Sequence, residues 1–142
     1  MTPNLSLVAE PKEVTEGMKV LVAEDNPINQ TLVEILLSDL GHDVTLVSDG
    51  REAVQKVKAE SWDLVLMDVQ MPELDGLEAT EQIRKWEAST SRQRVPIIAL
   101  TAQALQGDRE RCLQMGMDGY LSKPIDEDEL ERELERMAAN RR

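Results

Sequence analysis

The sequence predicts an α/β protein with a five-stranded, doubly wound parallel sheet and helices on both faces of that sheet. Short apolar runs alternate with longer amphipathic stretches from residue 18 onward. The middle runs are rich in Val, Leu and Ile at consecutive positions, which is typical of strands that are covered on both sides. The length of 142 residues suits one domain of this kind.

The apolar runs predict five short strands. They lie at residues 18–23, 43–47, 63–67, 96–100 and 119–121. Each run is followed by a stretch in which apolar residues recur at helical spacing, so a helix is expected after every strand.

The first helix is expected to begin after Asn26, because Asn is a favoured N-cap and Pro27 suits the first helical position. Gly41 is a helix stop signal, and His42 just after it is expected to be an exposed loop residue. Between cap and stop lies a broad apolar stripe, made of Ile28, Leu32, Ile35, Leu36 and Leu40.

Four further helices are indicated by their apolar residues. In chain order these are Ala53, Val54 and Val57; Ala79, Ile83 and Trp86; Leu105, Cys112 and Met115; and Leu130, Leu134 and Met137. The last helix is expected to begin at Asp126, with Glu129 as its capping-box partner.

Charge and composition exclude several classes of function. With 16 basic and 28 acidic residues, the formal net charge is −12, which disfavours direct binding to nucleic acid or to anionic membranes. The single cysteine excludes an internal disulfide. No apolar run reaches the length of about 18 residues that a membrane span needs. We therefore expect a cytoplasmic protein.

The chain divides into three parts. Residues 1–17 mix Pro, Gly, Thr, Ser and Glu without sustained periodicity and are interpreted as a flexible leader or linker remnant. Residues 18–138 form the expected folded domain, and residues 139–142 a short C-terminal tail.

Polar residues follow all five expected strands, and those after the second, Ser48 and Asp49, lie outside the pattern of the other four. Glu24 and Asp25 come after the first strand, Asp68 after the third, Thr101 after the fourth and Lys123 after the fifth. In doubly wound sheets, binding sites lie beyond the carboxyl ends of the strands. We therefore expect these five side chains to converge on one edge of the sheet.

Three carboxylates in one place indicate a divalent cation. Two unit charges about 4 Å apart repel by about 4 kcal/mol at an effective dielectric near 20, and a bound cation removes that repulsion. Oxygen ligands without clustered His or Cys favour Mg²⁺, with Mn²⁺ as a second possibility, over zinc. An Asp beside a metal, a lysine and a hydroxyl donor is suited to attack of the carboxylate on phosphorus.

Four sequence runs resemble the receiver domain of two-component response regulators. They are VLVAEDNPINQ (20–30), LVLMDVQMPELDGLEAT (64–80), VPIIALTA (95–102) and GMDGYLSKPI (116–125). The resemblance covers residues 18–138, and the first two runs are most similar to receivers of hybrid histidine kinases. It implies a flavodoxin-like sheet of strand order 2-1-3-4-5.

The resemblance also implies a role for each strand-end residue. Asp68 would accept a phosphoryl group from phosphohistidine. Asp25, Asp68 and the backbone carbonyl of Gln70 would bind Mg²⁺ directly, and Glu24 would act through water. Lys123 would contact the phosphoryl group, and the bond from Lys123 to Pro124 would be cis.

Further residues are assigned to switching and to the lifetime of the phosphorylated state. Thr101 would move to bind the new phosphoryl oxygen, and Tyr120 would change rotamer with it. Gln70 and Gln103, each two residues after a site residue, would tune the lifetime. The phosphoryl donor would be a histidine kinase or a histidine phosphotransfer domain docking near the first helix. An unknown downstream protein would bind the face formed by the fourth helix, the fifth strand and the last helix.

These roles predict a signalling switch or phosphorelay carrier rather than a turnover enzyme, one that catalyses only its own phosphorylation and slow dephosphorylation. The chain could be a stand-alone carrier, a regulator that acts by binding a partner, or a receiver of a longer hybrid kinase. The alternative is a metal-dependent phosphatase that forms an aspartyl-phosphate. Such enzymes resemble D-x-D, and position 70 here is Gln, which is not a general acid.

Overall fold

The computed structural model describes residues 17–71, 73–102 and 108–140 of the chain. Three sets of expectations lie outside these ranges. They are the leader except for Gly17, the positions of Gln103 and Leu105, and residues 141–142 of the expected tail.

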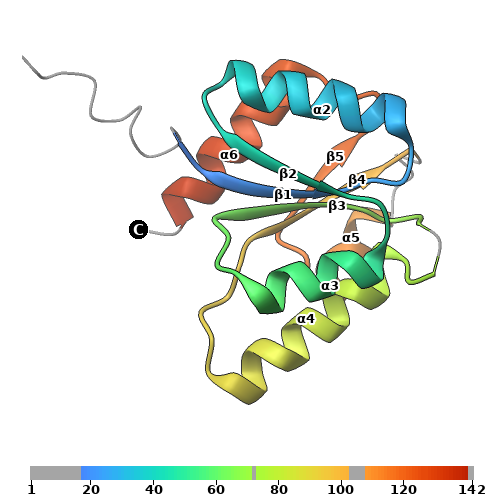
Figure 1. Cartoon of the computed structure of the whole chain (residues 1–142), viewed down its shortest axis with the longest axis vertical. Coiled ribbons are helices and arrows are strands. Elements are labelled where there is room, and N and C mark those ends of the chain that lie inside the picture. Colours follow the sequence, from blue (N-terminus) through green and yellow to red (C-terminus); the bar gives the residue numbers. More distant parts are fainter. Residues whose placement is uncertain (1–16, 72, 103–107, 141–142) are drawn as a thin grey trace, which may run out of the picture.

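The described residues form a five-stranded parallel sheet of order β2-β1-β3-β4-β5, as predicted (Figure 1). The strands are β1 (Lys19–Ala23), β2 (Asp43–Val47), β3 (Leu64–Asp68), β4 (Ile97–Thr101) and β5 (Gly119–Ser122). Strand order reverses between β1 and β3, which makes their carboxyl ends the topological switch point of the sheet.

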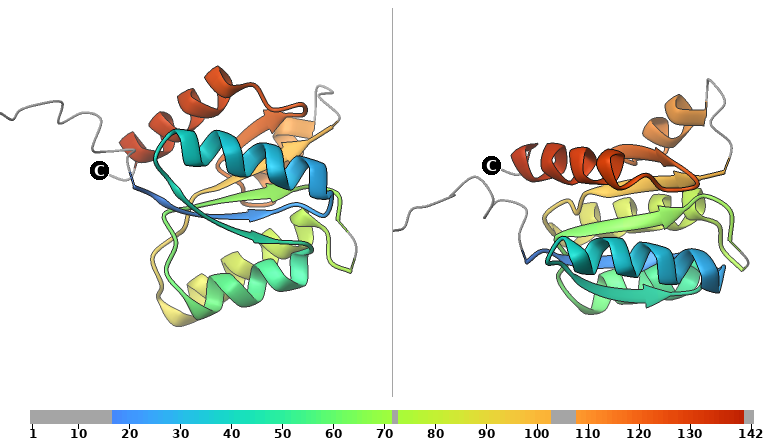
Figure 2. Two further views of the ribbon diagram at one scale, coloured as in Figure 1. Left: turned by 45° about the horizontal axis from the view of Figure 1, so that its top comes forward. Right: turned by 90° about the horizontal axis from the view of Figure 1, so that it is seen from above.

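Helices cover both faces of the sheet. They are α2 (Pro27–Asp39), α3 (Gly50–Ala59), α4 (Gly76–Thr90), α5 (Asp108–Gln114) and α6 (Glu127–Asn140). Helices α2 and α6 lie side by side on one face (Figure 2) and share a core with Val20, Val22 and Leu66. Helices α3, α4 and α5 pack on the other face, around Leu21, Val65 and Met67. The side chains of β3 and β4 are buried throughout, which explains their nearly continuous apolar sequence.

Three of the strands end one residue later than their apolar runs. Asp68 is the last residue of β3, Thr101 that of β4 and Ser122 that of β5. Backbone pairing explains the difference, because Asp68 still pairs with Leu100 of β4 and Thr101 with Ser122 of β5. Both polar side chains are therefore held by the sheet itself rather than by a loop.

Helix α2 begins as predicted and buries only part of its apolar stripe. The Asn26 side chain accepts hydrogen bonds from the amides of Ile28 and Asn29, and Pro27 opens the helix. The buried residues are Val33 and Leu37, while three residues of the apolar stripe are exposed: Ile28 by 79%, Leu32 by 38% and Ile35 by 52%. The other two, Leu36 and Leu40, pack against the core. The apolar stripe is therefore wider than the contact of the helix with the sheet.

The expectation of an exposed His42 was also wrong. His42 is only 7% exposed, and its Nδ1 accepts a hydrogen bond from the backbone amide of Met18. The turn after α2 folds back over the start of β1, where the amide of Asp43 also donates to the carbonyl of Met18. The imidazole therefore satisfies a backbone amide that this approach buries.

The last helix has the expected cap but extends two residues into the expected C-terminal tail of residues 139–142. The Asp126 carboxylate accepts a hydrogen bond from the Glu129 amide, as an N-cap does, and α6 continues to Asn140. Cys112 is buried on α5 among apolar side chains. Within the described ranges, no helix is long and apolar enough to cross a membrane.

Candidate functional site

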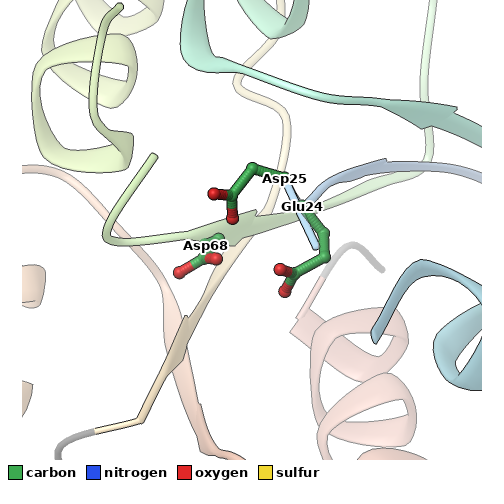
Figure 3. A group of neighbouring side chains, drawn as sticks. All are labelled: Glu24, Asp25 and Asp68. Atoms are coloured by element: carbon green, nitrogen blue, oxygen red, sulfur yellow. The ribbon is translucent and has the colours of Figure 1, made fainter. Parts of the chain in front are cut away.

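Three carboxylates meet at the switch point of the sheet. Glu24 and Asp25 follow β1, and Asp68 ends β3, its neighbour. One carboxylate oxygen from each residue lies within 4.8 Å of the others (Figure 3). Glu24 is 1% exposed and Asp68 is 4% exposed, whereas Asp25 faces solvent. The predicted acidic cluster is therefore formed, with one open side.

Lys123 reaches the same cluster from the end of β5. Its Nζ lies 2.8 Å from an oxygen of Asp68 and 2.8 Å from an oxygen of Glu24. The peptide bond from Lys123 to Pro124 is cis, as expected. The backbone amide of Lys123 donates to the carbonyl of Thr101, which joins the ends of β4 and β5.

The local backbone orients the two buried carboxylates. The amide of Gln70 donates to Asp68 Oδ1 at 3.1 Å, and the amide of Asn26 donates to Glu24 Oε2 at 3.1 Å. The side-chain amide of Gln30 donates a hydrogen bond to the backbone carbonyl of Glu24. Asn29 and Gln30 were missed by the sequence reasoning, because only the packing of the first turn of α2 against β1 brings them to the site.

The two buried acids have opposite pKa shifts. Burial raises the pKa of Asp68, and the nearby Glu24 charge adds to this, so that its pKa is about 6 despite Lys123 and the Gln70 amide. Burial also acts to raise the pKa of Glu24, but Lys123 and the Asn26 amide more than offset it, and the net pKa is lowered. For Lys123, burial is outweighed by the two carboxylates, which raise its pKa. Glu24 and Lys123 are thus a charged pair, and Asp68 is the group whose charge is least well compensated.

An open cleft of about 570 Å³ gives access to these groups. Thr101 and Ala102 line it at the end of β4, and Gln70 and Met71 line it after β3. Tyr120 lies on β5, half-buried against the core on the side of α3 and α4. The five predicted strand-end residues therefore share one cleft, and Tyr120 lies on the strand that leads to it.

The donor set of the cleft fits a small divalent cation. All three acidic side chains offer oxygen, and Lys123 is the one cation among the described residues that line the cleft. One ammonium group leaves the three carboxylates undercompensated, which oxygen-preferring Mg²⁺ would correct.

A second cleft, of about 320 Å³, lies at the opposite edge of the sheet, near the starts of β1, β3 and β4. It is lined by Trp62 and Trp86. Of its three acidic residues, Glu60 and Glu87 form ion pairs with Lys19 and Arg84, and Asp63 accepts a hydrogen bond from the Lys19 amide. The strand-end cleft is therefore the candidate functional site.

A doubly wound sheet that carries an acidic cluster and a lysine at its switch point defines an α/β domain whose strand-end cleft has the donor set for a small divalent cation. The model of the response regulator receiver domain matches residues 20–135, and the chain belongs to this family. It is a receiver domain of two-component signalling.

The similar proteins include sensor kinases. The chain is 52% identical over 112 residues to the sensor protein GacS of Pseudomonas syringae pv. syringae, covering 79% of this chain. It is 42% identical over 114 residues to the signal transduction histidine-protein kinase BarA of Escherichia coli (strain K12), covering 80% of this chain. The matched part is only 12% of the length of each relative.

Two solved structures are similar over most of this chain. The receiver domain of the sensor histidine kinase PA1611 from Pseudomonas aeruginosa PAO1, with a magnesium ion in its active site cleft, has 51% sequence identity and a TM-score of 0.77, covering 87% of this chain and 98% of that one. The receiver domain of Ssk1 from Saccharomyces cerevisiae, in complex with the histidine phosphotransfer protein Ypd1, has 34% identity and a TM-score of 0.80, covering 87% and 90%.

Proposed function

We propose that this receiver domain takes a phosphoryl group from a phosphohistidine onto Asp68. The observation that carries the proposal is the position of the Asp68 carboxylate. It is held at the end of β3, with Lys123 on one oxygen and the Gln70 amide on the other, at the floor of an open cleft. A carboxylate with two positioned donors has a defined direction of attack.

In the proposed step, an Asp68 oxygen forms a bond to phosphorus as the bond from phosphorus to the histidine nitrogen breaks. Lys123 exchanges its contact with Asp68 for one with a phosphoryl oxygen and stabilises the charge that develops there. Asp25, Asp68 and the Gln70 carbonyl would hold Mg²⁺, and Glu24 would act through water; Mn²⁺ has the same ligand preference. When bound, the cation neutralises the phosphoryl oxygens.

The reaction modifies the domain itself, so the domain is proposed to be a switch with slow self-dephosphorylation rather than a turnover enzyme. Thr101 and Tyr120 would transmit the change to the face formed by α5, β5 and α6, where a downstream protein would bind. Gln70 and Gln103 would tune the lifetime of the acyl phosphate. The phosphatase alternative is not favoured, because Gln70 stands where those enzymes use an acid.

The phosphoryl donor is proposed to dock on α2. The exposed side chains of Ile28, Leu32 and Ile35 lie on this helix, whose first turn borders the cleft. Leu32 also lines a small hollow with Pro124 and Ile125, which extends the apolar surface to the end of β5. A histidine kinase or a histidine phosphotransfer domain could cover this surface while presenting its histidine to Asp68. The Ssk1 receiver, crystallised with a histidine phosphotransfer protein, supports this class of partner.

Because phosphohistidine is made from ATP, we place the domain in the cytoplasm.

The test is intact-mass spectrometry after incubation with acetyl phosphate and Mg²⁺. One phosphoryl adduct that is lost with a chelator and is labile to hydroxylamine is expected. No adduct from acetyl phosphate, and none from a phosphorylated histidine phosphotransfer domain, would refute the proposal for a protein shown to be folded.

A further inference from the structure

Two glycines bring the first turns of α3 and α4 into direct contact with the end of β3 and with the turn before α4. A Cβ atom at Gly76 would overlap the carbonyl oxygen of Asp68 and lie 2.9 Å from both its carbonyl carbon and Met67 Cγ. A Cβ atom at Gly50 would overlap the carbonyl oxygen of Leu74 and lie 2.8 Å from its carbonyl carbon. Except for Met67 Cγ, these obstacles are backbone atoms, which cannot rotate away as the end of a side chain can.

Close approach, not conformational freedom, explains both glycines. Neither has the left-handed backbone that is found at Gly41 and Gly116. An alanine could adopt the same backbone angles at Gly50 or Gly76, but it could not occupy the same space. The absent side chain is therefore what the structure requires at these two positions.

The contact at Gly76 acts on the backbone that orients the Asp68 carboxylate. The amide of Gly76 donates to the carbonyl of Val69 at 3.0 Å, and the amide of Val69 donates to Leu100 of β4 at 2.9 Å. The next amide, that of Gln70, donates a hydrogen bond to the Asp68 carboxylate. The segment from Asp68 to Gln70 thus lies between β4 on one side and the first turn of α4 on the other.

We propose that Gly76 is a positioning residue for phosphoryl transfer to Asp68, and that Gly50 supports the turn before α4 through its contact with Leu74. This inference rests on the proposed function of Asp68. Without a side chain at position 76, the first turn of α4 rests on the Asp68 carbonyl and fixes the direction of the carboxylate. A misplacement on the order of 1 Å is sufficient to slow a positioned reaction about 10²-fold.

The experiment compares the wild-type chain with Gly76→Ala, Gly50→Ala and a control, Gly41→Ala. The control lies in the turn after α2, at the opposite edge of the sheet, where a Cβ meets nothing within 4 Å but the backbone φ of +90° strains alanine. It lowers stability without touching the cleft. For each variant, the phosphorylation rate by acetyl phosphate at saturating Mg²⁺, the Mg²⁺ affinity by calorimetry and the unfolding midpoint are measured.

We expect Gly76→Ala to slow phosphorylation about 10²-fold at saturating Mg²⁺ and to weaken Mg²⁺ binding, with Gly50→Ala slower than wild type by a smaller factor. Gly41→Ala should lower the unfolding midpoint and keep the wild-type rate. If Gly76→Ala does not fold in buffer, both it and the wild type are measured in trimethylamine N-oxide, which favours the folded state. A rate within threefold of wild type for folded Gly76→Ala would overturn the proposal and leave the glycine a purely structural role.

The two proposals fail in distinguishable ways. If the wild type itself takes no phosphoryl group from any donor, the proposed function is refuted. The positioning of Asp68 is then judged by Mg²⁺ affinity alone, and an affinity of Gly76→Ala equal to that of the wild type would refute it as well.

Discussion

Lys123 holds its ammonium nitrogen 2.8 Å from the Asp68 carboxylate, although 55 residues separate the two in the sequence. The lysine comes from the end of β5 and the aspartate from the end of β3, with β4 between them. In this state the lysine occupies one oxygen of the proposed phosphoacceptor and also contacts Glu24. The Lys123 ammonium group is therefore already in the site. It must exchange its contact with Asp68 for one with the phosphoryl group when that group arrives.

Replacing Asp68 by Asn should abolish phosphorylation, because the amide is not a nucleophile toward phosphorus. The fold should persist and gain stability at neutral pH in the absence of metal, since a poorly compensated buried charge is removed. Mass spectrometry with acetyl phosphate and thermal unfolding check the two halves of this prediction. Labelling of the variant at the wild-type rate would place the phosphoacceptor elsewhere.

Lys123→Ala should slow phosphorylation by about 10²-fold or more, because a positioned charge that stabilises the transferred group is lost. Mg²⁺ binding, measured by calorimetry, should be retained, since the three carboxylates remain. Lys85→Ala is a matched control, as this lysine is 77% exposed on α4. Loss of Mg²⁺ binding and of phosphorylation to the same extent would contradict the assigned role of Lys123.

Mg²⁺ affinity should fall as the pH drops through about 6, the pKa of Asp68 in the metal-free fold. The cation competes with the proton for this carboxylate, so well below pH 6 each pH unit should weaken binding about tenfold. Calorimetry at a series of pH values measures the slope. A binding curve that is flat from pH 7 to pH 5 would exclude Asp68 as a ligand.

In the metal-free protein, the raised pKa of Asp68 should make the stability of the fold depend on pH. Because the folded-state pKa of Asp68 is raised above the ordinary aspartate value of 3.8, the folded protein retains a proton that the unfolded chain loses. The contribution of Asp68 to the free energy of unfolding is therefore greatest at low pH and decreases as the pH rises from about 4 to about 6. The difference in urea unfolding between wild type and Asp68→Asn isolates this contribution from that of Glu24, whose lowered pKa acts in the other direction.

Ile28→Asp should weaken phosphotransfer from a histidine phosphotransfer domain about tenfold, which corresponds to about 1.4 kcal/mol of docking free energy. The side chain is 79% exposed, so stability and phosphorylation by acetyl phosphate should not change. Leu113→Asp, on α5, is the control, because this leucine is also exposed but lies away from α2. Equal effects of both substitutions would argue against docking on α2.

Arg84→Ala should destabilise the fold by up to about 3 kcal/mol, because it breaks ion pairs in which Glu87 is buried and Arg84 is 14% exposed. Its guanidinium contacts Glu87 of α4 and Asp118 before β5, and donates to the carbonyls of Val95 and Gly116. Arg94 also pairs with Asp118 but is more exposed, so Arg94→Ala should lower the free energy of unfolding by less. Urea unfolding of the two variants measures the difference, and similar losses would refute the special role of Arg84.

The sequence alone was sufficient to predict the layers of the fold and the residues at the strand ends. Parallel strands covered on both faces need apolar residues at consecutive positions, and this is a local pattern that β3 and β4 show directly. Because such strands point the same way, Asp25, Asp68 and Lys123 could be placed at one edge before any contact was known.

Tertiary structure alone decided which apolar and polar groups are buried. The sequence places His42 in a loop, but it is buried because the turn after α2 packs over the Met18 amide. Ile28 belongs to the apolar stripe of α2, but it is exposed because the contact with the sheet is narrower than that stripe. The contact of Gly76 with the Asp68 backbone likewise depends on how α4 is seated against β3. Hydrophobic periodicity reports which side of a helix can be buried, whereas the actual contact depends on the distance and angle between elements, which are set by packing over the whole domain.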